Sequence, residues 1–326
     1  MEKKIDVIIP AYNAQNTIGR TIASVIIQSI VDKLTVTIVN DCDDIGYDKF
    51  VKQFSDLVDI KEIKLDPNGG PGVARQFGID NTTSPYFTCI DADDTFAGAF
   101  ALEILLNSAE SNSQFHTIVG SFVEQQEGLK FLNHTNDLIW MFGKLYTRSF
   151  INRYNIRFNK TRANEDNGFN TFIRLVSSET EKVMFLPDVV YYWHHKVDSI
   201  TRINNCQYSY DQSFVGYTDN MIYAIQEAKK QKPFNSYIDM WAIQIMAQLY
   251  IYYLQTVKRD SKFKEQNYDC CVKYYNEVFK NYITMNKENL DPIFSQTFTD
   301  QAINMNDIVP DQTIYQFIDK LQNSNL

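Results

Sequence analysis

The chain has 326 residues, of which 44% are hydrophobic, and a formal net charge of −9 at pH 7. This length allows two domains, or one domain with a large appendage, and the apolar fraction is enough for a substantial core. An acidic chain lacks the broad basic surface of proteins that coat DNA or anionic membranes, so those functions are disfavoured, although a local basic site stays open.

The first apolar run is too short for a secretory signal. It covers about five residues, contains Asp6 and is broken by Pro10, so it indicates a strand. The longest apolar stretch, residues 240–254, contains two glutamines and falls short of the roughly 20 residues of a membrane-spanning helix. The five cysteines are odd in number and form no CxxC pair, which indicates reduced thiols. We therefore expect a cytoplasmic protein without a transmembrane segment.

Strands and helices alternate over the first third of the chain. Runs rich in β-branched residues are followed by segments whose apolar residues have helical spacing. Such βαβ units build a mostly parallel sheet, in which ligands bind beyond the carboxyl ends of the strands. In chain order we predict a strand at 5–13, a helix at 17–30, a strand at 34–41, a helix at 47–57, a strand at 58–65, a helix at 71–82 and a strand at 86–91.

The pattern becomes mixed after about residue 111. Strands are predicted at 116–125 and 182–195, with an acidic turn at 164–170 between them. Strand signals vanish after about residue 205, and the remaining segments have helical spacing. We therefore divide the chain into a domain of residues 1–205 and a helical C-terminal domain of residues 206–326. The C-terminal helices are predicted at 212–230, 240–254, 268–282 and 313–322.

The four strands of the first third all end in groups suited to ligand binding. Because the carboxyl ends of parallel strands meet at one edge of a sheet, these groups indicate a shared site. They are Pro10-Ala11-Tyr12-Asn13, Asn40-Asp41, Asn68-Gly69-Gly70-Pro71-Gly72, and the aspartates Asp91, Asp93 and Asp94.

Two common nucleotide-binding motifs are absent. No GxxxxGK[ST] occurs, which excludes a P-loop. The glycine-rich segment has Arg75 where GxGxxG requires its third glycine, and it follows the third strand rather than the first. A dinucleotide-binding Rossmann site is therefore disfavoured.

Asp91-Ala92-Asp93 places two carboxylates at the end of a strand. A hard cation such as Mg²⁺ or Mn²⁺ would neutralise them and keep positions open for substrate phosphates. The alternative is an acidic turn in which Asp94 caps a helix that begins near Phe96.

The order of these motifs closely resembles the nucleotide-sugar-binding half of family 2 glycosyltransferases of the GT-A fold. Their usual string is P-x-Y/F-N, then V-x-D, then N-x-G-x-x-x-A-R-N-x-G, then D-x-D-D. The resemblance covers roughly residues 5–205 and implies a Rossmann-like mixed sheet flanked by helices, here with a helical C-terminal region. This chain differs in having Gln76 where Asn is frequent, and Asn40-Asp41-Cys42-Asp43 where Asp-Asp-x-Ser is common.

The resemblance implies a nucleoside diphosphate-sugar as donor, typically a UDP-sugar. Asp41 would accept a hydrogen bond from the base, with a strand-end cap as its alternative role. Arg75 would lie along the diphosphate, and Gly70 would let the backbone approach the donor. Asp91 would face the ribose or the metal, and Asp93 would be the main ligand of Mn²⁺ or Mg²⁺. The remaining implied donor-binding residues are Pro10, Ala11, Tyr12, Asn13, Ala92 and Arg202.

A second signal is the acidic pair Glu165-Asp166. The resemblance implies that Asp166 is the general base that deprotonates the acceptor hydroxyl, with Glu165 beside it. A partly buried carboxylate near another acid has a pKa raised toward a value useful for this role. The alternative role of Asp166 is an N-cap for a helix at 167–176.

A third signal lies in residues 191–202. GT-A enzymes often place a histidine metal ligand here, and His194 or His195 would fill that role. Adjacent strand residues face opposite sides, so the choice between the two stays open. Lys196 and Arg202 are candidate contacts of the diphosphate.

The segment 140–150 resembles the turn into the helix before the acceptor region of the family. Trp140 could stack on the face of a sugar, although a large aromatic side chain is more often part of the core. Lys144 is a candidate for lining the site.

Taken together, these features predict an inverting glycosyltransferase that moves a sugar from a nucleoside diphosphate-sugar to an acceptor hydroxyl. The acceptor stays open among a glycan, another polymer, a protein and a modified nucleobase. The helical C-terminal region could shape the acceptor site or form a homo-oligomer. Two alternatives are a metal-dependent nucleotidyltransferase, which would release pyrophosphate, and a non-catalytic nucleotide- or carbohydrate-binding protein on the same fold.

Overall fold

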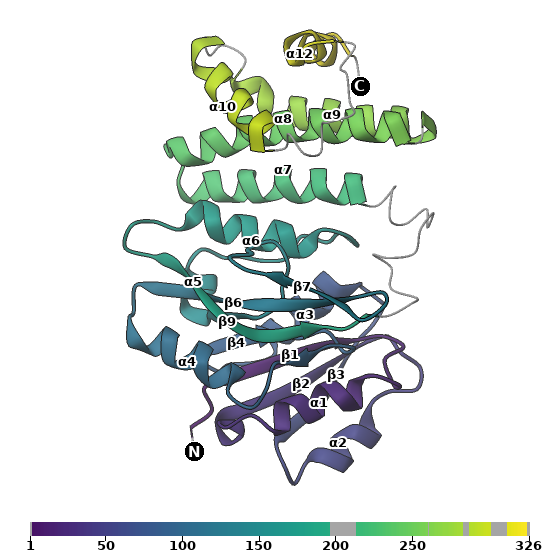
Figure 1. Ribbon diagram of the computed structural model, residues 1–326, viewed down its shortest axis with the longest axis vertical. Coiled ribbons are helices and arrows are strands. Elements are labelled where there is room, and N and C mark those ends of the chain that lie inside the picture. The colour runs from purple at the N-terminus through teal and green to yellow at the C-terminus, as the bar shows by residue number, and fades with distance from the viewer. Residues whose placement is uncertain (1, 196–212, 260, 283–286, 301–311, 325–326) are drawn as a thin grey trace. The chain divides into compact units, whose positions relative to one another are not determined.

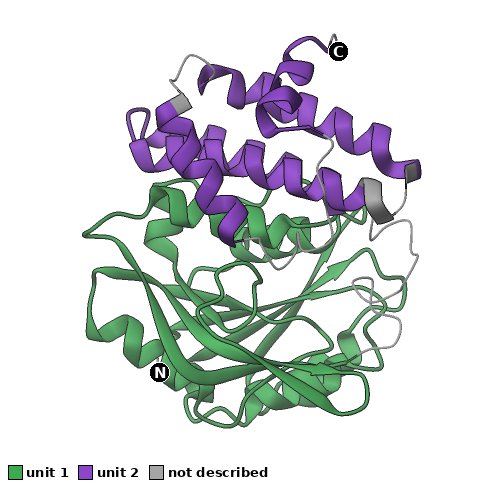
Figure 2. Ribbon diagram, turned by 45° about the horizontal axis from the view of Figure 1, so that its top comes forward, with its two compact units in different colours: residues 1–199 green, residues 200–326 purple. Residues whose placement is uncertain are grey.

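The computed structural model describes residues 2–195, 213–259, 261–282, 287–300 and 312–324. The chain divides into two compact units, Met1–Ser199 and Ile200–Leu326, which are coloured separately in Figure 2. The predicted domain boundary at residue 205 lies outside the described residues, as do Lys196 and Arg202.

The first unit contains a nine-stranded mixed sheet with the order β3-β2-β1-β4-β8-β6-β9-β5, and β7 pairs with β6 (Figure 1). The strands β3, β2, β1 and β4 are parallel, β8 is antiparallel to β4 and β6, and β9 is parallel to β6. The predicted mixed α/β fold is therefore confirmed. The strands are β1 (Ile5–Ala11), β2 (Leu34–Asp41), β3 (Asp59–Leu65), β4 (Tyr86–Cys89), β5 (Thr95–Phe96), β6 (Phe115–Gln126), β7 (Lys130–His134), β8 (Lys144–Thr147) and β9 (Lys182–Trp193).

Helices pack on both faces of the sheet because β1 carries apolar side chains on both sides. Ile5, Val7 and Ile9 join one buried cluster with residues of α1 and α4. Ile8 points to the opposite face, toward α3, where a Cβ on Gly78 would lie 2.4 Å from Ile8 Cγ2. A glycine is thus required for this close helix-to-strand packing. The helices of this unit are α1 (Ile18–Ile26), the short 3₁₀ helix η1 (Val31–Lys33), α2 (Asp48–Phe54), α3 (Pro71–Asp80), α4 (Ala101–Ser111), α5 (Arg148–Arg153) and α6 (Glu165–Val176).

Two predicted capping roles are wrong. The residues after Asp94 form the strand β5, and the next helix, α4, begins only at Ala101, so Asp94 does not cap a helix near Phe96. The helix α6 begins at Glu165 with Asn164 at its N-cap, which places Asp166 inside the first turn. Both carboxylates are therefore available for other contacts.

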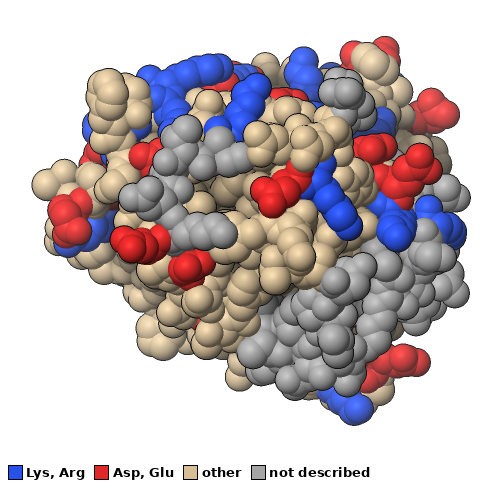
Figure 3. Space-filling view, turned by 90° about the horizontal axis from the view of Figure 1, so that it is seen from above, with Lys and Arg blue, Asp and Glu red and all other residues tan. Residues whose placement is uncertain are grey.

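The second unit is helical in its described residues. Helix α8 packs against α7, α9, α10 and α12, and its residues Ala242, Met246 and Leu249 are fully buried. None of the helices in the described ranges is long and apolar enough to cross a membrane. The described residues drawn in Figure 3 mix basic and acidic side chains rather than presenting a broad surface of one sign. The helices are α7 (Ser213–Gln231), α8 (Ser236–Arg259), η3 (Ser261–Phe263), α9 (Lys264–Glu277), η4 (Phe279–Tyr282), α10 (Lys287–Asp300) and α12 (Ile314–Gln322).

Candidate active site

The loop after β1 is held by Asp43, a residue that the motif comparison did not select. Its carboxylate accepts hydrogen bonds from the Asn13 backbone at 2.8 Å, from Gln15 Nε2 at 2.6 Å and from Tyr47 Oη at 2.8 Å. Burial opposes the charge on Asp43, but these hydrogen bonds outweigh it and lower the pKa of the carboxyl. The loop is thereby fixed in a conformation that leaves Tyr12 57% exposed.

Asp41 holds the glycine-rich turn between β3 and α3. Its two carboxylate oxygens accept hydrogen bonds from the backbone N–H groups of Gly69 at 2.7 Å and Gly70 at 2.8 Å. The Asn68 side chain donates to the same carboxylate at 3.0 Å. Gly70 has a φ of 83°, which disfavours other residues. In the structure Asp41 therefore lies at the end of β2 and orders the turn between β3 and α3. Its contact with a nucleotide base stays a prediction.

Arg75 joins the glycine-rich segment to both acidic motifs. Its Nη2 lies 2.7 Å from Asp91 Oδ1 and its Nη1 lies 2.8 Å from Glu165 Oε1. Only 5% of Arg75 is exposed, and the paired carboxylates raise its pKa despite the opposing effect of burial. The helices approach closely because Gly72 has no side chain: a Cβ there would lie 2.7 Å from Glu165 Cγ. Arg75 therefore links Asp91 and Glu165, whereas its predicted contact with a diphosphate stays a prediction.

Asp166 follows Glu165 in the first turn of α6 and is half-buried. Burial and the neighbouring Glu165 carboxylate raise the pKa of Asp166 to about 7, and Arg75 opposes this rise. A carboxylate with a pKa near neutrality is suited to accept a proton. The fully buried Lys144 is close enough for Asp166 to affect its pKa, although burial still lowers that pKa to about 8.

The aspartates after β4 have different surroundings. Asp94 is 1% exposed and accepts hydrogen bonds from Tyr191 Oη at 2.7 Å and from the His194 backbone at 2.8 Å. Burial, with added repulsion from Asp91 and Asp93, holds the pKa of Asp94 well above its usual value. The hydrogen bonds from Tyr191 and His194 act in the opposite direction and favour the carboxylate of Asp94, which belongs to the aspartate segment, residues 91–94.

The structure distinguishes the two candidate histidines. The His194 ring lies against the aspartate segment, with Nε2 2.8 Å from Thr95 Oγ1, and burial lowers its pKa with a further contribution from Arg20. The backbone N–H of His195 instead donates to Gln125 on β6. Within the described ranges, no group of three or more His, Cys, Asp and Glu side chains is arranged to hold a metal ion.

Several of the predicted site residues thus lie close together in the structure. Arg75 binds both Asp91 and Glu165, and Glu165 is the chain neighbour of Asp166. Asp41 orders the turn that precedes Arg75. Ala92 is buried, and the backbone carbonyl of Asp93 accepts a hydrogen bond from Arg20. The motif comparison assigned no role to six residues that contact the site, because their hydrogen-bond partners are seen only in the folded chain. They are Gln15, Arg20, Asp43, Tyr47, Thr95 and Tyr191.

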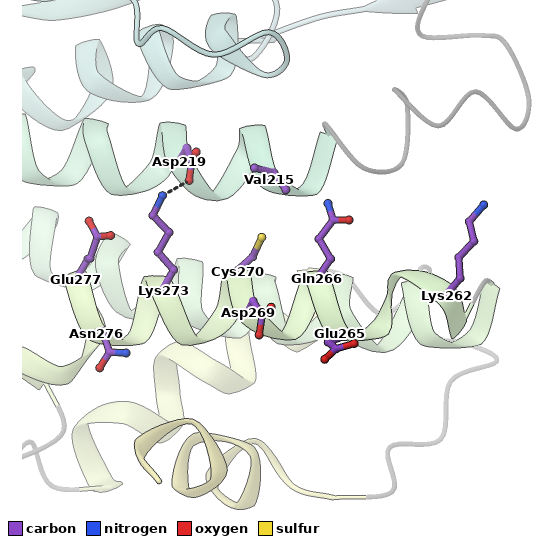
Figure 4. A pocket seen from close by; sticks show the side chains of 10 residues that line it. All are labelled: Val215, Asp219, Lys262, Glu265, Gln266, Asp269, Cys270, Lys273, Asn276 and Glu277. Carbon is purple, nitrogen blue, oxygen red and sulfur yellow. Dashed lines mark hydrogen bonds and ion pairs between the residues drawn. The ribbon is translucent and has the colours of Figure 1, made fainter. Parts of the chain in front are cut away.

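A separate hollow of about 750 Å³ lies in the second unit, between α7 and α9 (Figure 4). The ion pair between Lys273 Nζ and Asp219 Oδ1, at 2.8 Å, spans the two helices. None of the residues that line this hollow belongs to the predicted motifs. They are Val215, Asp219, Lys262, Glu265, Gln266, Asp269, Cys270, Lys273, Asn276 and Glu277.

The strand order and the carboxylates beyond the strand ends define the first unit as a GT-A fold with a polar site. Residues 6–174, more than half of the chain, match the family model described as glycosyl transferase family 2. The chain therefore belongs to this family.

Known proteins with similarity to the chain are consistent with this assignment. The glycosyltransferase GlyA of Streptococcus pneumoniae is 25% identical over 230 residues, which are 62% of this chain and 32% of that protein. The chain thus matches about a third of this relative's length.

Two solved structures share the fold. That of Staphylococcus aureus TarS 1-349 in complex with UDP-GlcNAc has a TM-score of 0.71 and 15% identity, covering 92% of this chain and 89% of the other. The mannosyltransferase PcManGT of Pyrobaculum calidifontis, in complex with GDP-Man and Mn²⁺, has a TM-score of 0.50 and 13% identity, covering 99% of this chain and 80% of the other.

Proposed function

We propose that the chain is an inverting glycosyltransferase that moves a sugar from a UDP-sugar to an acceptor hydroxyl. The observation that carries the proposal is the link from the strand-end aspartate Asp91, through Arg75, to Glu165 and the adjacent Asp166. In support of the proposal, this link joins a strand-end carboxylate to the helix of Asp166, whose pKa is raised to about 7, and ligands of such sheets bind beyond the carboxyl ends of the strands. The UDP-GlcNAc complex of TarS, which shares the fold, supports UDP as the nucleotide.

Asp166 acts as the general base in this proposal. Its carboxylate takes the proton of the acceptor hydroxyl while the hydroxyl oxygen forms a bond to the anomeric carbon of the donor. The bond between that carbon and the diphosphate breaks on the opposite side, and the nucleoside diphosphate leaves with the electron pair. Glu165 and Arg75 fix the start of α6 and so position Asp166. In this proposal the nucleotide binds against two segments: the turn that Asp41 orders and the loop that Asp43 holds.

A divalent cation fits this site if the protein and the phosphates of the donor both supply its ligands. Mg²⁺ and Mn²⁺ are commonly held by one or two carboxylates, with substrate phosphates and water completing the shell. Asp93 and Asp91 would be the protein ligands, and the Asp91 side chain is still 31% exposed beside Arg75. His194 is the nearer histidine, since its ring lies against the same segment. The cation would neutralise the charge of the leaving diphosphate.

Measuring the released nucleotide tests the proposal against its alternatives. The chain is incubated with UDP-GlcNAc, UDP-glucose and UDP-galactose, each with and without Mn²⁺ and with and without added pyrophosphate, and both UDP and UTP are quantified. Release of UDP supports the proposal, whereas UTP formed only with added pyrophosphate indicates a nucleotidyltransferase, because that enzyme run in reverse converts a UDP-sugar and pyrophosphate to UTP and a sugar 1-phosphate. A thermal-shift screen of the same donors runs in parallel, because a donor that binds the folded state raises its stability. Stabilisation without any UDP release would indicate a binding protein and overturn the proposal.

A further inference from the structure

Three aromatic side chains form a cluster that we call the tryptophan platform: Trp140, Phe142 and Trp193. The ring centroids of the two tryptophans are 5.4 Å apart, and each lies within 5.8 Å of the Phe142 ring. Phe142 is 5% exposed, whereas both tryptophans are only half-buried. The platform thus combines a buried aromatic base with two partly exposed indoles, which also pack against the hydrophobic core of the first unit.

The helix that carries Asp166 positions one side of the platform. The Asn170 side chain, one helical turn beyond Asp166, donates hydrogen bonds to the carbonyls of Ile139 at 3.0 Å and Trp140 at 3.1 Å. Tyr146 Oη donates to the Asn170 side-chain oxygen at 2.9 Å and so fixes the orientation of the amide. The platform is therefore attached directly to the element that holds the proposed base.

The aspartate segment positions the other side of the platform. The Tyr191 ring stacks on Phe142 with centroids 5.0 Å apart, and its hydroxyl donates to Asp94. The backbone N–H of Asp91 donates to the same hydroxyl at 3.3 Å. The platform is thus joined by direct contacts both to the aspartates after β4 and to the helix that carries the proposed base.

A carboxylate and an imidazole lie on the same face of the sheet as Trp193. Glu124 pairs with Trp193 across β6 and β9, so both side chains point to one face. His134 Nε2 lies 3.0 Å from Glu124 Oε2, and the His134 ring stacks on Phe122, which in turn contacts Phe142. The side chains of Glu124 and His134 keep 14% and 22% exposure. Such groups can hydrogen-bond sugar hydroxyls beside an aromatic stacking surface.

We propose that the tryptophan platform binds a sugar ring of an uncharged saccharide acceptor. Indole faces pack against the apolar face of a pyranose ring, and the Glu124–His134 pair would bind its hydroxyls. The acidic residues beside the platform argue against an anionic polymer: Glu124 is opposite Trp193, and Asp137 accepts a hydrogen bond from the Trp140 backbone. The assignment of the bound sugar as acceptor rests on the proposed function, whereas saccharide binding itself does not.

Tryptophan fluorescence provides a direct test, because the chain has three tryptophans. In the Trp241→Phe variant, which changes a residue of the second unit, all remaining tryptophan emission comes from the platform when the excitation is selective for tryptophan over tyrosine. We expect methyl β-D-glucopyranoside and cellobiose to change this emission saturably, and sorbitol 6-phosphate to leave it unchanged. By calorimetry, Trp140→Ala and Trp193→Ala should each weaken cellobiose binding about tenfold, and Trp140→Phe should weaken it less. The phenylalanine variant keeps the test valid if the alanine variants fail to fold.

The outcomes separate this proposal from the proposed function. Three results would overturn saccharide binding by the platform. Sorbitol 6-phosphate could bind as well as the neutral saccharides, or neither neutral saccharide could bind. Cellobiose could also bind equally well to folded variants of both tryptophans. The thermal shift produced by UDP, measured on the same variants, should stay the same, because the platform holds no predicted donor residue. Cellobiose binding that depends on both tryptophans supports the platform even if no UDP-sugar is turned over, in which case only the proposed function fails.

Discussion

Two buried arginines of the first unit neutralise carboxylates in different ways. Arg148 donates through all three of its nitrogens: Nε to the Ser84 carbonyl, Nη1 to the Ile79 carbonyl and Nη2 to Asp6 at 2.8 Å. Asp6 also accepts two hydrogen bonds from Ser84, at 2.7 and 2.8 Å. One cation therefore meets one carboxylate, and the polar groups around them are paired.

Arg75 faces a surplus of negative charge. Its two Nη atoms bind Asp91 and Glu165, its Nε has no hydrogen-bond partner in the described structure, and Asp166 adds a further carboxylate next to Glu165. Buried polar groups are normally paired, so such an excess needs an explanation. The difference lies in charge balance: the Arg148 network is neutral and paired, whereas the Arg75 network has more carboxylates than cations, as the proposed ligand and proton binding requires.

Arg148→Met should have the largest effect and should act on stability. It leaves the Asp6 carboxylate buried without its cation, which costs about 3–5 kcal/mol in the free energy of unfolding. Urea denaturation measures this loss. Arg157→Met is the matched control, because the Arg157–Asp80 pair is exposed and should contribute less than about 1 kcal/mol. Equal losses in the two variants would contradict the structural role of the Arg148 network.

Asp166→Asn should have nearly as large an effect, but on catalysis. An amide cannot take the acceptor proton, so transfer should fall about a thousandfold, within the range for a lost general base. Stability should stay the same or rise, because burial and Glu165 disfavour the charge on Asp166. Product formation and thermal unfolding are measured together, with Asp80→Asn on the surface of α3 as the control. Full activity of Asp166→Asn would exclude this residue as the base.

Arg75→Lys should have an intermediate effect. Lysine keeps the charge but is a single point cation, so it cannot bridge Asp91 and Glu165 as the guanidinium does. We expect kcat to fall between about tenfold and a hundredfold through misplacement of Asp166 and Asp91. The KM for the donor separates the two roles of Arg75. An unchanged KM indicates that Arg75 positions the carboxylates. A rise in KM that accounts for the whole loss of kcat/KM indicates that Arg75 contacts the diphosphate.

The alternation of strand and helix patterns predicted the parallel part of the fold, because β1 and β2 are rich in β-branched residues and each of the first three strands is followed by a segment of helical spacing. The strand predicted at 34–41 is β2 with the same bounds. The strands β5, β7 and β8 were missed, since β5 has only two residues, β7 lacks a buried face and β8 has four residues after Gly143. Such strands depend on their neighbours in the sheet rather than on a pattern of their own.

The candidate site was predictable in its residue types but less so in its contacts. The family resemblance implied that Arg75 contacts the diphosphate, but the two carboxylates that it binds come from segments 16 and 90 residues away. The role of Asp94 depends on Tyr191, 97 residues further along the chain. Motif spacing does not encode pairings over such separations, so the sequence could not distinguish ligands from residues that position them.

The pH dependence of transfer should show the smallest effect and sharpens the comparison. With the pKa of Asp166 raised to about 7, the rate should fall about tenfold for each pH unit below 7, because only the carboxylate accepts a proton. The effect of this group on stability has the opposite sign. Since the folded state holds this proton more tightly than the unfolded state, the contribution of Asp166 to the free energy of unfolding decreases as pH rises from about 4 to 7.

The decisive measurement for this pH dependence is kcat between pH 5 and 9, with product quantified directly. The acidic limb, which is the fall of kcat at low pH, should have its midpoint near pH 7 in the parent protein. It should be absent from the residual activity of Asp166→Asn. Replacing Arg75 with Gln should move the limb to higher pH, because the Arg75 charge lowers the pKa of Asp166. A limb centred near 4 would mean that the base is an ordinary exposed carboxylate, and the surplus of negative charge around Arg75 would then have to serve metal binding alone.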